Sequence, residues 1–392
     1  MTIPFIDLQS QFRRIQQDVE AAVLKVLRSG QYILGPEVDR LERTLAEYAG
    51  TRHCVSCASG TDALLIALMA KGIGPGDAVF APTFTFFATA EVIALLGATP
   101  VFVDIDPATF NISPAGLEAA ILAVRSGRPD GHPLPAPALA SAAGAPLRPR
   151  AVIPVDLFGL AADYDALVPI AKRHGLTVIE DAAQSFGAEL RGRRAGALAE
   201  IGCTSFFPAK PLGAYGDGGA LFTDDPALDA LFRSIRVHGQ GEDRYENVRL
   251  GLTGRLDAIQ AAILLEKMKI FGDEIVARQR VAAGYAAALH AAEVRVTVPA
   301  IPPGYLSAWA QYSVLAESEA HRRELLARLK SAGVPTAIYY PKPLHLQTAF
   351  AGLGHRAGDY PHSEAAAARI FSLPMHPYLD EAAIAQIVAA MR

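Results

Sequence analysis

The chain has 392 residues, enough for two domains or for one large domain with a smaller companion. Hydrophobic residues make up 51% and charged residues 19%, so a large core can be buried and wholesale disorder is excluded. The 36 Lys and Arg residues and the 40 Asp and Glu residues give a formal net charge of -4. This balance argues against a nucleic-acid binder, because neutralising phosphates needs a clustered basic excess.

Targeting signals and cysteine usage narrow the class further. No apolar run reaches the length of about 18 residues typical of a membrane span. The first residues lack a basic segment followed by an apolar one, so we expect no signal peptide. Cys54 and Cys57 form a CxxC pair, but no second ligand pair follows for zinc, so we interpret both as small core residues. With Cys203 they make three cysteines, which fits a reducing cytoplasm.

Short apolar runs typical of strands alternate with helical patterns through the first half of the chain. This alternation favours a mostly parallel sheet with helices on both faces. Ligands bind such a sheet beyond the carboxyl ends of its strands, so strand-end residues are the candidates for a site. We expect strands at 52–57, 78–81, 99–104, 151–156 and 177–181, and helices at 62–71, 87–96, 114–124 and 164–174.

Residues 126–150 break this rhythm, being rich in Pro, Ala and Gly. Since the prolines remove backbone donors, we predict neither a regular helix nor a strand there, and interpret the segment as a surface insertion. The segment is interpreted either as a solvated spacer or as a functional lid.

A long helix is predicted over 256–289, followed by strands at 294–298, 312–315 and 336–340 and helices at 321–332 and 363–370. The predicted division is a large domain at 1–255, and the long helix with a small domain at 256–392.

The segment 54–64 leaves a predicted strand and enters a predicted helix at 59–61. Free backbone N–H groups and the helix dipole make such a junction an anion site. Gly60 lets a ligand approach the backbone, and Thr61 adds a hydroxyl. The alternative is a plain helix cap, with Ser59 or Thr61 capping the first turn.

Two further residues suggest chemistry at strand ends. Asp181 closes an apolar strand, where its carboxylate could hold a proton on a ring nitrogen of a ligand, or form a cap or an ion pair. Lys210 lies in a glycine-rich loop between two prolines, a setting that suits a lowered pKa and covalent chemistry with a carbonyl group; a solvated lysine is the alternative. The sequence GAYGDGG after it is no dinucleotide fingerprint, because a strand-like run follows instead of a helix.

His345, in a Pro-rich loop with aromatic neighbours, is either a binding or a structural histidine.

Taken together, these segments resemble the DegT/DnrJ/StrS family of sugar aminotransferases, which use pyridoxal phosphate. The resemblance covers nearly the whole chain, and its specificity comes from the order and spacing of motifs that are weak alone. The motifs are PFIDL at 4–8, GQYILGPEV at 30–38, SGTDAL at 59–64, PTFTFFAT at 82–89, FVDID at 102–106, EDAAQ at 180–184, SFFPAK at 205–210, GDGG at 216–219, RLDAIQAA at 255–262 and PLHLQ at 343–347.

The resemblance implies the aspartate-aminotransferase-like (type I pyridoxal-phosphate) fold, an α/β fold with a large domain that carries a mostly parallel sheet and a smaller C-terminal α/β domain. It implies that Lys210 bonds to the cofactor and moves the proton, while Asp181 keeps the pyridine nitrogen protonated. Gln184 would approach the ring hydroxyl, and Phe86 would stack on the ring. The residues implied to hold the phosphate are Gly60, Thr61 and Ser205.

The family also forms homodimers with shared active sites, and the segment 251–257 resembles the one that reaches into the partner's site. The family usually has an asparagine there that contacts the phosphate, whereas this chain has Thr253, which is shorter and has no amide donor. Arg255 matches the motif's arginine, which would lie near carboxylate groups of the donor or the sugar. His345 is the second candidate substrate contact. The insertion at 126–150 is longer than usual for the family.

The resemblance implies transfer of an amino group from L-glutamate to a nucleotide-linked keto sugar, for amino-sugar and polysaccharide biosynthesis. The motifs at 154–159 and 206–213 look like those of members that aminate C3 of UDP-linked 3-keto-N-acetylglucosaminuronic acid. Members that aminate C4 of 4-keto-6-deoxy sugars share most of them and are the alternative. A non-catalytic regulator of the same fold could lose Lys210 or Asp181, and this chain keeps both. We expect no metal, nucleic acid or membrane as a partner.

Overall fold

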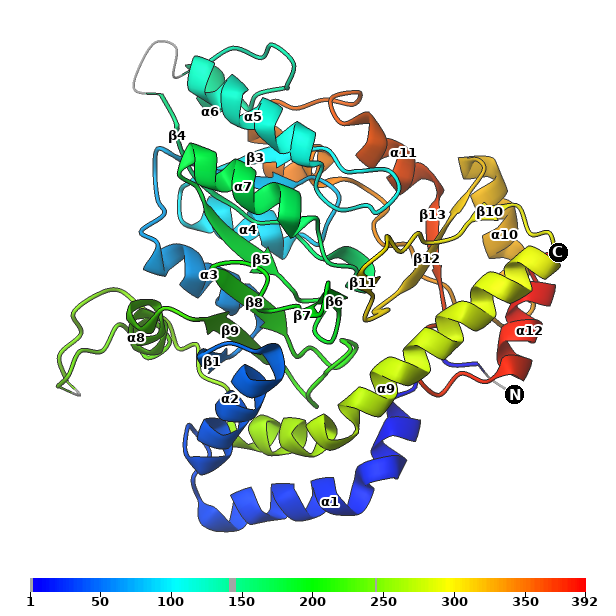
Figure 1. Ribbon diagram of the computed structural model, residues 1–392, viewed down its shortest axis with the longest axis horizontal. Helices are drawn as coiled ribbons and strands as arrows, with labels where there is room; N and C mark the ends of the chain where they lie inside the picture. Colours follow the sequence, from blue (N-terminus) through cyan, green and yellow to red (C-terminus); the bar gives the residue numbers. More distant parts are fainter. Residues whose placement is uncertain (1–2, 141–145, 244) are drawn as a thin grey trace.

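The computed structural model describes residues 3–140, 146–243 and 245–392, and a seven-stranded sheet forms its centre (Figure 1). The strand order is β1-β9-β8-β5-β4-β2-β3. β9 runs antiparallel to both neighbours, and the remaining pairings are parallel, which confirms the mostly parallel sheet. The strands are β1 His53–Cys57, β2 Asp77–Pro82, β3 Thr99–Val103, β4 Arg148–Val152, β5 Thr177–Asp181, β8 Ile201–Ser205 and β9 Gly219–Thr223.

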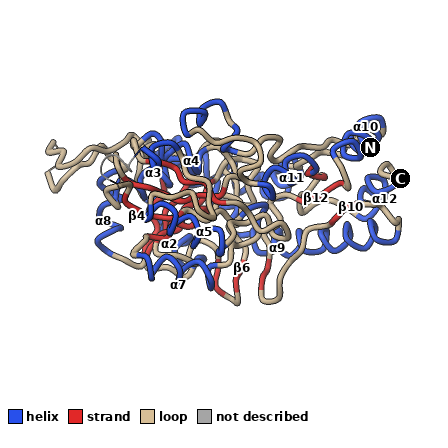
Figure 2. Tube along the Cα trace, turned by 90° about the horizontal axis from the view of Figure 1, so that it is seen from above, coloured by secondary structure: helices blue, strands red, loops and turns tan. Residues whose placement is uncertain are grey.

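Helices cover both faces of this sheet, as Figure 2 shows with α3 and α4 on one side of the strands and α5 and α7 on the other. Because side chains alternate along a strand, Val79 and Ala81 join the buried cluster that includes α3 and α4, whereas Ala78 and Phe80 join the one with α5 and α7. Strands buried on both faces give continuous apolar runs, the signal that predicted them. The helices are α1 Leu8–Ser29, α2 Pro36–Ala49, α3 Gly60–Ala70, α4 Ala88–Leu95, α5 Pro114–Ser126, α7 Tyr164–His174 and α8 Pro226–Ile235.

Helix α9, Ala258–Ala291, confirms the predicted long helix and runs from the large sheet to the C-terminal part of the chain (Figure 1). α1 lies along it, and Arg14 of α1 forms an ion pair with Asp273 at 2.5 Å. At its far end a second hydrophobic cluster contains Tyr285, Tyr312 and Phe371. The elements there are β10 Val296–Thr297, β12 Tyr312–Ala316, α10 Glu319–Ser331, α11 Pro361–Arg369, β13 Ile370–Leu373 and α12 Glu381–Ala389, with the antiparallel sheet order β10-β12-β13.

The prediction of neither helix nor strand at 126–150 was wrong at several points. A short helix, α6 Ala136–Ala140, forms inside the segment. β4 already begins at Arg148 and ends at Val152, so the strand predicted at 151–156 was wrong at both ends. Pro137 fits because it lies in the first turn of α6, where a missing N–H costs nothing. Pro149 fits because the pairing of β4 with β2 shifts register at this point. Residues 141–145 of the predicted insertion lie outside the described residues.

The predicted strand at 336–340 is also absent: the segment makes a single bridge, between Ala337 and Ser372. The place beside β12 is taken by β13, whose first residue had been assigned to the end of a helix. Short apolar runs do not distinguish a strand from a helix end by periodicity alone. A small sheet of β6 Glu189–Leu190, β7 Arg193–Arg194 and β11 Tyr305–Leu306 and the 3₁₀ turns η2 Leu157–Gly159, η3 Leu344–Leu346 and η4 Thr348–Leu353 complete the described elements.

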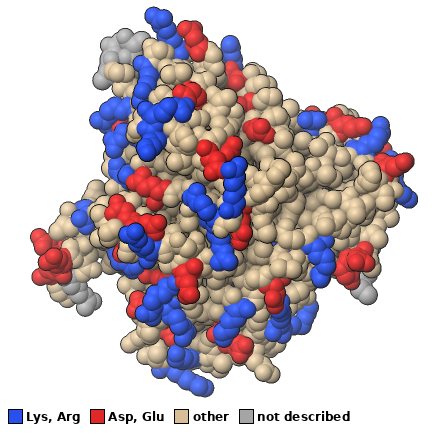
Figure 3. Space-filling view, viewed as in Figure 1, with Lys and Arg blue, Asp and Glu red and all other residues tan. Residues whose placement is uncertain are grey.

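The visible surface carries charges of both signs, in keeping with the formal net charge of -4. On the face seen in Figure 3, Lys and Arg lie interspersed with Asp and Glu. Among the residues that the structure describes, none of the helices combines the length and the apolar character needed to cross a membrane. Cys54, Cys57 and Cys203 are free and buried, which confirms the interpretation of the CxxC pair as core residues.

Candidate active site

A cavity of about 620 Å³ lies where strands β5 and β8 end, and residues 339–342 of the C-terminal part line it as well. The carboxyl ends of parallel strands are the expected place for a ligand in this architecture. The cavity brings together side chains from α3, from the connection between β2 and α4, and from the ends of β5 and β8. The predicted cofactor residues that line it are Gly60, Thr61, Phe86, Asp181, Gln184, Ser205 and Lys210.

The first turn of α3 presents its backbone to this cavity. The Ser59 hydroxyl accepts a hydrogen bond of 3.0 Å from the N–H of Asp62, which confirms Ser59 as the helix cap. The N–H groups of Gly60 and Thr61 have no acceptor among the described residues. Ser205, at the end of β8, packs against the same turn. The junction therefore carries a cap and also leaves two N–H donors for an anion.

Gly60 fits here because it has no side chain: a Cβ would lie 2.6 Å from the Cβ of Ser205. We expect Gly60→Ala to lower the free energy of unfolding by about 1–3 kcal/mol, because the first turn of α3 must move away from β8. Urea unfolding of the cofactor-free protein measures this. The matched control is Gly272→Ala in α9, where a Cβ meets nothing within 4 Å and helix propensity predicts a gain of about 0.5–1 kcal/mol. Equal stability of the two variants would contradict the close contact.

Asp181 occupies the last position of β5 and is 5% exposed. Its Oδ2 accepts a hydrogen bond of 2.9 Å from the hydroxyl of Thr89, and its Oδ1 accepts one of 3.2 Å from the N–H of Ala183. Burial raises the pKa of Asp181, and these hydrogen bonds and the charge of Lys210 oppose the rise. The neighbouring Glu180 accepts from the N–H groups of Gly196 and Leu198 instead. Of the two acids in the motif, only Asp181 lines the cavity.

Lys210 lies in a loop whose shape is fixed by contacts within its own backbone. Its N–H donates to the carbonyl of Phe207 at 2.9 Å. A Cβ on Gly213 would lie 2.4 Å from the carbonyl oxygen of Pro208, so the loop needs a glycine there. Burial lowers the pKa of Lys210, and the charge of Asp181 opposes that shift. No hydrogen bond or ion pair of the Lys210 amine is found within the described residues, which leaves it available for chemistry in the cavity.

Aromatic and amide side chains line the same cavity as this lysine. The Gln184 amide accepts from the N–H of Phe158 at 2.9 Å and donates to the Tyr340 hydroxyl at 3.1 Å. Phe86 lines the cavity although it is 56% exposed, so its ring is accessible to a flat ligand. Sequence reasoning missed Tyr340 and also missed Thr89. The aromatic pair at 339–340 and the two threonines four residues apart in the motif at 82–89 were the available signals.

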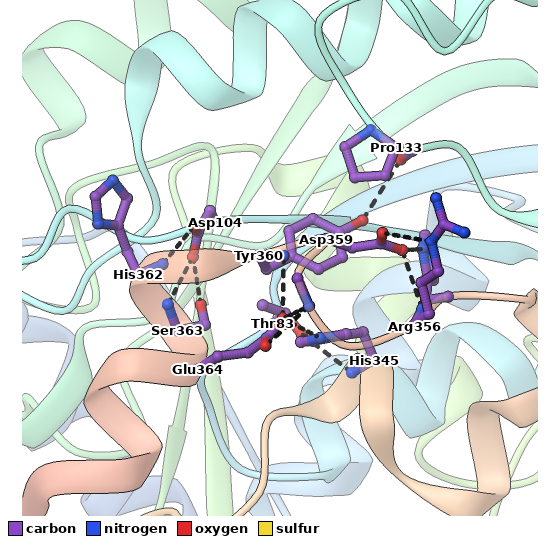
Figure 4. A network of polar contacts seen from close by, with 12 residues as sticks. Thr83, Asp104, Pro133, His345, Arg356, Asp359, Tyr360, His362, Ser363 and Glu364 are labelled. Carbon is purple, nitrogen blue, oxygen red and sulfur yellow. Dashed lines mark hydrogen bonds and ion pairs between the residues drawn. The ribbon is translucent and has the colours of Figure 1, made fainter.

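His345 is not among the residues that line the cavity. Figure 4 shows it between Thr83 and Glu364 in a network of polar contacts. Its Nδ1 is 2.8 Å from the Thr83 hydroxyl, and its Nε2 is 3.2 Å from a carboxylate oxygen of Glu364. Burial lowers the pKa of His345, and Glu364 opposes this shift. Both ring nitrogens are thus engaged within the subunit. The geometry favours the structural reading of this histidine, whose neighbours Leu344 and Gln347 line the cavity.

Thr253 and Arg255 do not line the cavity of their own subunit. Thr253 is exposed, and its hydroxyl is 2.9 Å from Nε2 of His238. Arg255 is half-buried, and within the described ranges no hydrogen bond or ion pair of its guanidinium is found. Neither side chain therefore takes part in the cavity of its own subunit.

The arrangement fits pyridoxal phosphate. The N–H donors of Gly60 and Thr61 suit its phosphate, the buried Asp181 carboxylate suits a protonated ring nitrogen, the Lys210 amine suits its carbonyl group, and the Phe86 ring suits its flat ring. A lysine for covalent attachment and an acid for the pyridine nitrogen are the groups that pyridoxal-phosphate enzymes use.

The chain belongs to the DegT/DnrJ/EryC1/StrS aminotransferase family, whose model matches residues 13–392. It is 49% identical over 389 residues to the UDP-2-acetamido-2-deoxy-3-oxo-D-glucuronate aminotransferase of Pseudomonas aeruginosa, covering 99% of both chains. It is 44% identical to the pleiotropic regulatory protein of Geobacillus stearothermophilus, covering 97% of this chain and 95% of that one. It is 39% identical to the UDP-N-acetyl-3-dehydro-alpha-D-glucosamine 3-aminotransferase of Acidithiobacillus ferrooxidans, covering 100% and 97%.

Solved structures show the same fold. A DegT/DnrJ/EryC1/StrS aminotransferase from Brucella abortus superimposes with a TM-score of 0.90 at 51% identity, covering 100% of this chain and 98% of that one. A Bacillus subtilis protein solved with bound cofactor PMP superimposes with a TM-score of 0.85 at 28% identity, covering 99% and 82%. These structures confirm the fold that the resemblance implied.

Proposed function

We propose that this protein is a pyridoxal-phosphate-dependent aminotransferase that moves an amino group from L-glutamate to a nucleotide-linked keto sugar. The observation that carries this proposal is the convergence of Lys210, Asp181 and the first turn of α3 on one cavity. The proposed acceptor is a UDP-linked 3-keto uronic acid, in keeping with the name of the relative that is 49% identical. The proposed process is amino-sugar and polysaccharide biosynthesis.

Pyridoxal phosphate, when bound, supplies the electron-accepting ring that makes the carbon next to the amino group acidic. Lys210 is the proposed covalent attachment, and its amine, with a pKa lowered by burial, is the proposed carrier of the proton at that carbon. Asp181 would hold the proton on the ring nitrogen, and Thr89 fixes the orientation of its carboxylate. Gln184, which lines the same cavity, would approach the ring hydroxyl.

The remaining cofactor contacts are proposed on the same basis. Phe86 would stack on the ring, since it is exposed within the cavity. The N–H donors of the first turn of α3 would bind the phosphate together with the hydroxyls of Thr61 and Ser205. The proposed division at residues 255 and 256 is supported by the separate hydrophobic cluster of the C-terminal part. The three free, buried cysteines support the proposed cytoplasmic location.

A homodimer with shared active sites is part of the proposal. Thr253 and Arg255 lie outside the cavity of their own subunit, and Thr253 is exposed, as a group that serves the partner's site would be. In such a dimer each site combines the Lys210 of one subunit with the Arg255 of the other.

Mixed dimers test this sharing. Lys210→Ala and Arg255→Ala, each inactive alone, are expected to recover about a quarter of the wild-type activity when co-expressed in equal amounts. Half of the dimers are then mixed, and each mixed dimer has one intact site and one with both defects. Amino-sugar formation measures the recovery. Activity no greater than that of either variant alone would show that the two residues serve the same subunit's site.

The whole proposal is tested by absorbance and by product analysis. The protein loaded with pyridoxal phosphate should show a visible band that bleaches to a near-ultraviolet band when L-glutamate is added. The bleached protein should then aminate UDP-linked 3-keto-N-acetylglucosaminuronic acid in preference to a dTDP-linked 4-keto-6-deoxy sugar. Preference for the second sugar would support the alternative substrate class. The absence of any band after loading would contradict the proposed enzyme.

A further inference from the structure

Helix α9 carries a buried lysine directly beneath the loop of Lys210. The side chain of Lys267 extends from α9 to that loop, and the residue is only 1% exposed. Its Nζ donates a hydrogen bond of 2.6 Å to the carbonyl oxygen of Gly213 and lies 4.1 Å from the centre of the Tyr215 ring. Both contacts are with the chain that immediately follows Lys210.

A lysine is a costly residue at this position. Within the described parts of the chain, no carboxylate oxygen lies within 4.0 Å of the Lys267 amine. The charge of Glu274, on the same helix, raises the pKa of Lys267 from a distance, without direct contact. The Glu274 carboxylate is itself hydrogen-bonded to Gln11 and Tyr378. Burial consequently lowers the pKa of Lys267 to about 7. A buried amine without a counter-ion destabilises a fold, and an apolar side chain of the same length would not.

The group that Lys267 binds is the closing point of the catalytic loop. Gly213 packs so tightly against the carbonyl of Pro208 that no Cβ fits, and this packing folds the segment 208–213 around Lys210. A second residue of α9, Gln260, accepts a hydrogen bond of 2.9 Å from the N–H of Tyr215. The helix therefore holds the loop at two successive points, both within five residues of Lys210.

We propose that Lys267 is a positioning residue, which fixes the carbonyl of Gly213 on α9 and thereby sets where the amine of Lys210 stands in the cavity. Its kinetic consequence rests on the proposed aminotransferase function, whereas its effect on the loop does not. Burying the amine lowers the stability of the protein, and the benefit that we assign to it is a fixed position of the loop. Displacing a reacting group by about 1 Å can lower a rate by about 10²-fold, so this control of position matters for turnover.

Lys267→Met tests the proposal, because methionine keeps the length and removes the donor. We expect faster hydrogen–deuterium exchange of the amides at 206–214 in the cofactor-free and in the loaded protein, with β8 unchanged up to Thr204. We expect kcat to fall about 10- to 100-fold with little change in KM for the keto sugar. The cofactor-free variant should still fold at pH 7, with its unfolding temperature lowered by a few degrees at most, because removing the buried amine offsets the loss of the donor to the Gly213 carbonyl.

The matched control is Lys269→Met on the same helix, where the lysine is exposed and ion-paired with Glu266; it should leave exchange and kcat unchanged. If the amides at 206–214 exchange at the same rate in Lys267→Met as in the natural protein, the proposal is overturned. A variant that fails to fold would also overturn it, because the lysine would then serve the core. If the natural protein proves to lack aminotransferase activity while Lys267→Met still loosens the loop, the proposed function fails and the positioning role stands.

Discussion

Lys210→Ala is expected to lower turnover by about 10⁴-fold or more, the largest effect of any single substitution in this chain. One amine is proposed to hold the cofactor and to carry the proton, and general-base catalysis alone contributes about 10²- to 10⁴-fold. The measurement is formation of the amino sugar from L-glutamate and the UDP-linked 3-keto uronic acid. The visible absorbance of the loaded protein should be lost in the same variant.

Lys342→Ala is the matched control, because Lys342 also lines the cavity but is exposed. It should keep the visible band of the natural protein, whatever its effect on the affinity for the sugar. Thermal unfolding of both cofactor-free variants shows whether they are folded. Near-natural turnover by a folded Lys210→Ala protein would refute the assignment of Lys210, and with it the proposed enzyme.

The sequence predicted the large sheet well because local pattern and tertiary context agree there. Most strands are buried on both faces and each crossover helix has its own pattern, so β1, β2, β3 and β5 and the helices α3, α4, α5 and α7 were expected close to their observed bounds. The short α6 was not expected, and β4 was expected at 151–156 but spans Arg148–Val152. Ser59, Asp181 and Lys210 were recognisable for a related reason. Each lies at or just after a strand end, and parallel strands bring such ends to one edge of the sheet.

Contacts between distant segments were not predictable in this way. Gln184 and Tyr340 are 156 residues apart in the chain, and nothing local to either indicates the hydrogen bond between them. The pairing of Lys267 with Gly213 is of the same kind, since a lysine in a long helical pattern usually faces water. His345 lies in a loop that reads as a binding surface, but its two hydrogen-bond partners come from β2's end and from α11. In each case the contacts of the residue come from segments that are far away in the sequence, so the local pattern does not reveal them.

Asp181→Asn is expected to lower turnover by about 10²- to 10³-fold without lowering the stability of the cofactor-free protein. The amide oxygen keeps the acceptor for the N–H of Ala183, and the Thr89 hydroxyl can turn to accept from the amide NH2, whereas the charge proposed to hold a proton on the ring nitrogen is removed. Burial raises the pKa of Asp181 above 3.8 in the folded state. The folded protein therefore binds a proton more tightly than the unfolded chain, so this carboxyl is destabilising above its folded pKa and neutral below 3.8.

The difference in unfolding temperature between Asp181→Asn and the natural protein should consequently grow, in favour of the variant, as the pH rises above 3.8 and through the raised pKa of Asp181. Glu180→Gln is the matched control, since it alters the adjacent buried carboxyl, whose oxygens accept from the N–H groups of Gly196 and Leu198. One of these donors loses its acceptor in the glutamine variant, so stability should fall while turnover per folded molecule is kept. Similar turnover losses in both variants would mean that Asp181 acts through the fold and not on the ring nitrogen.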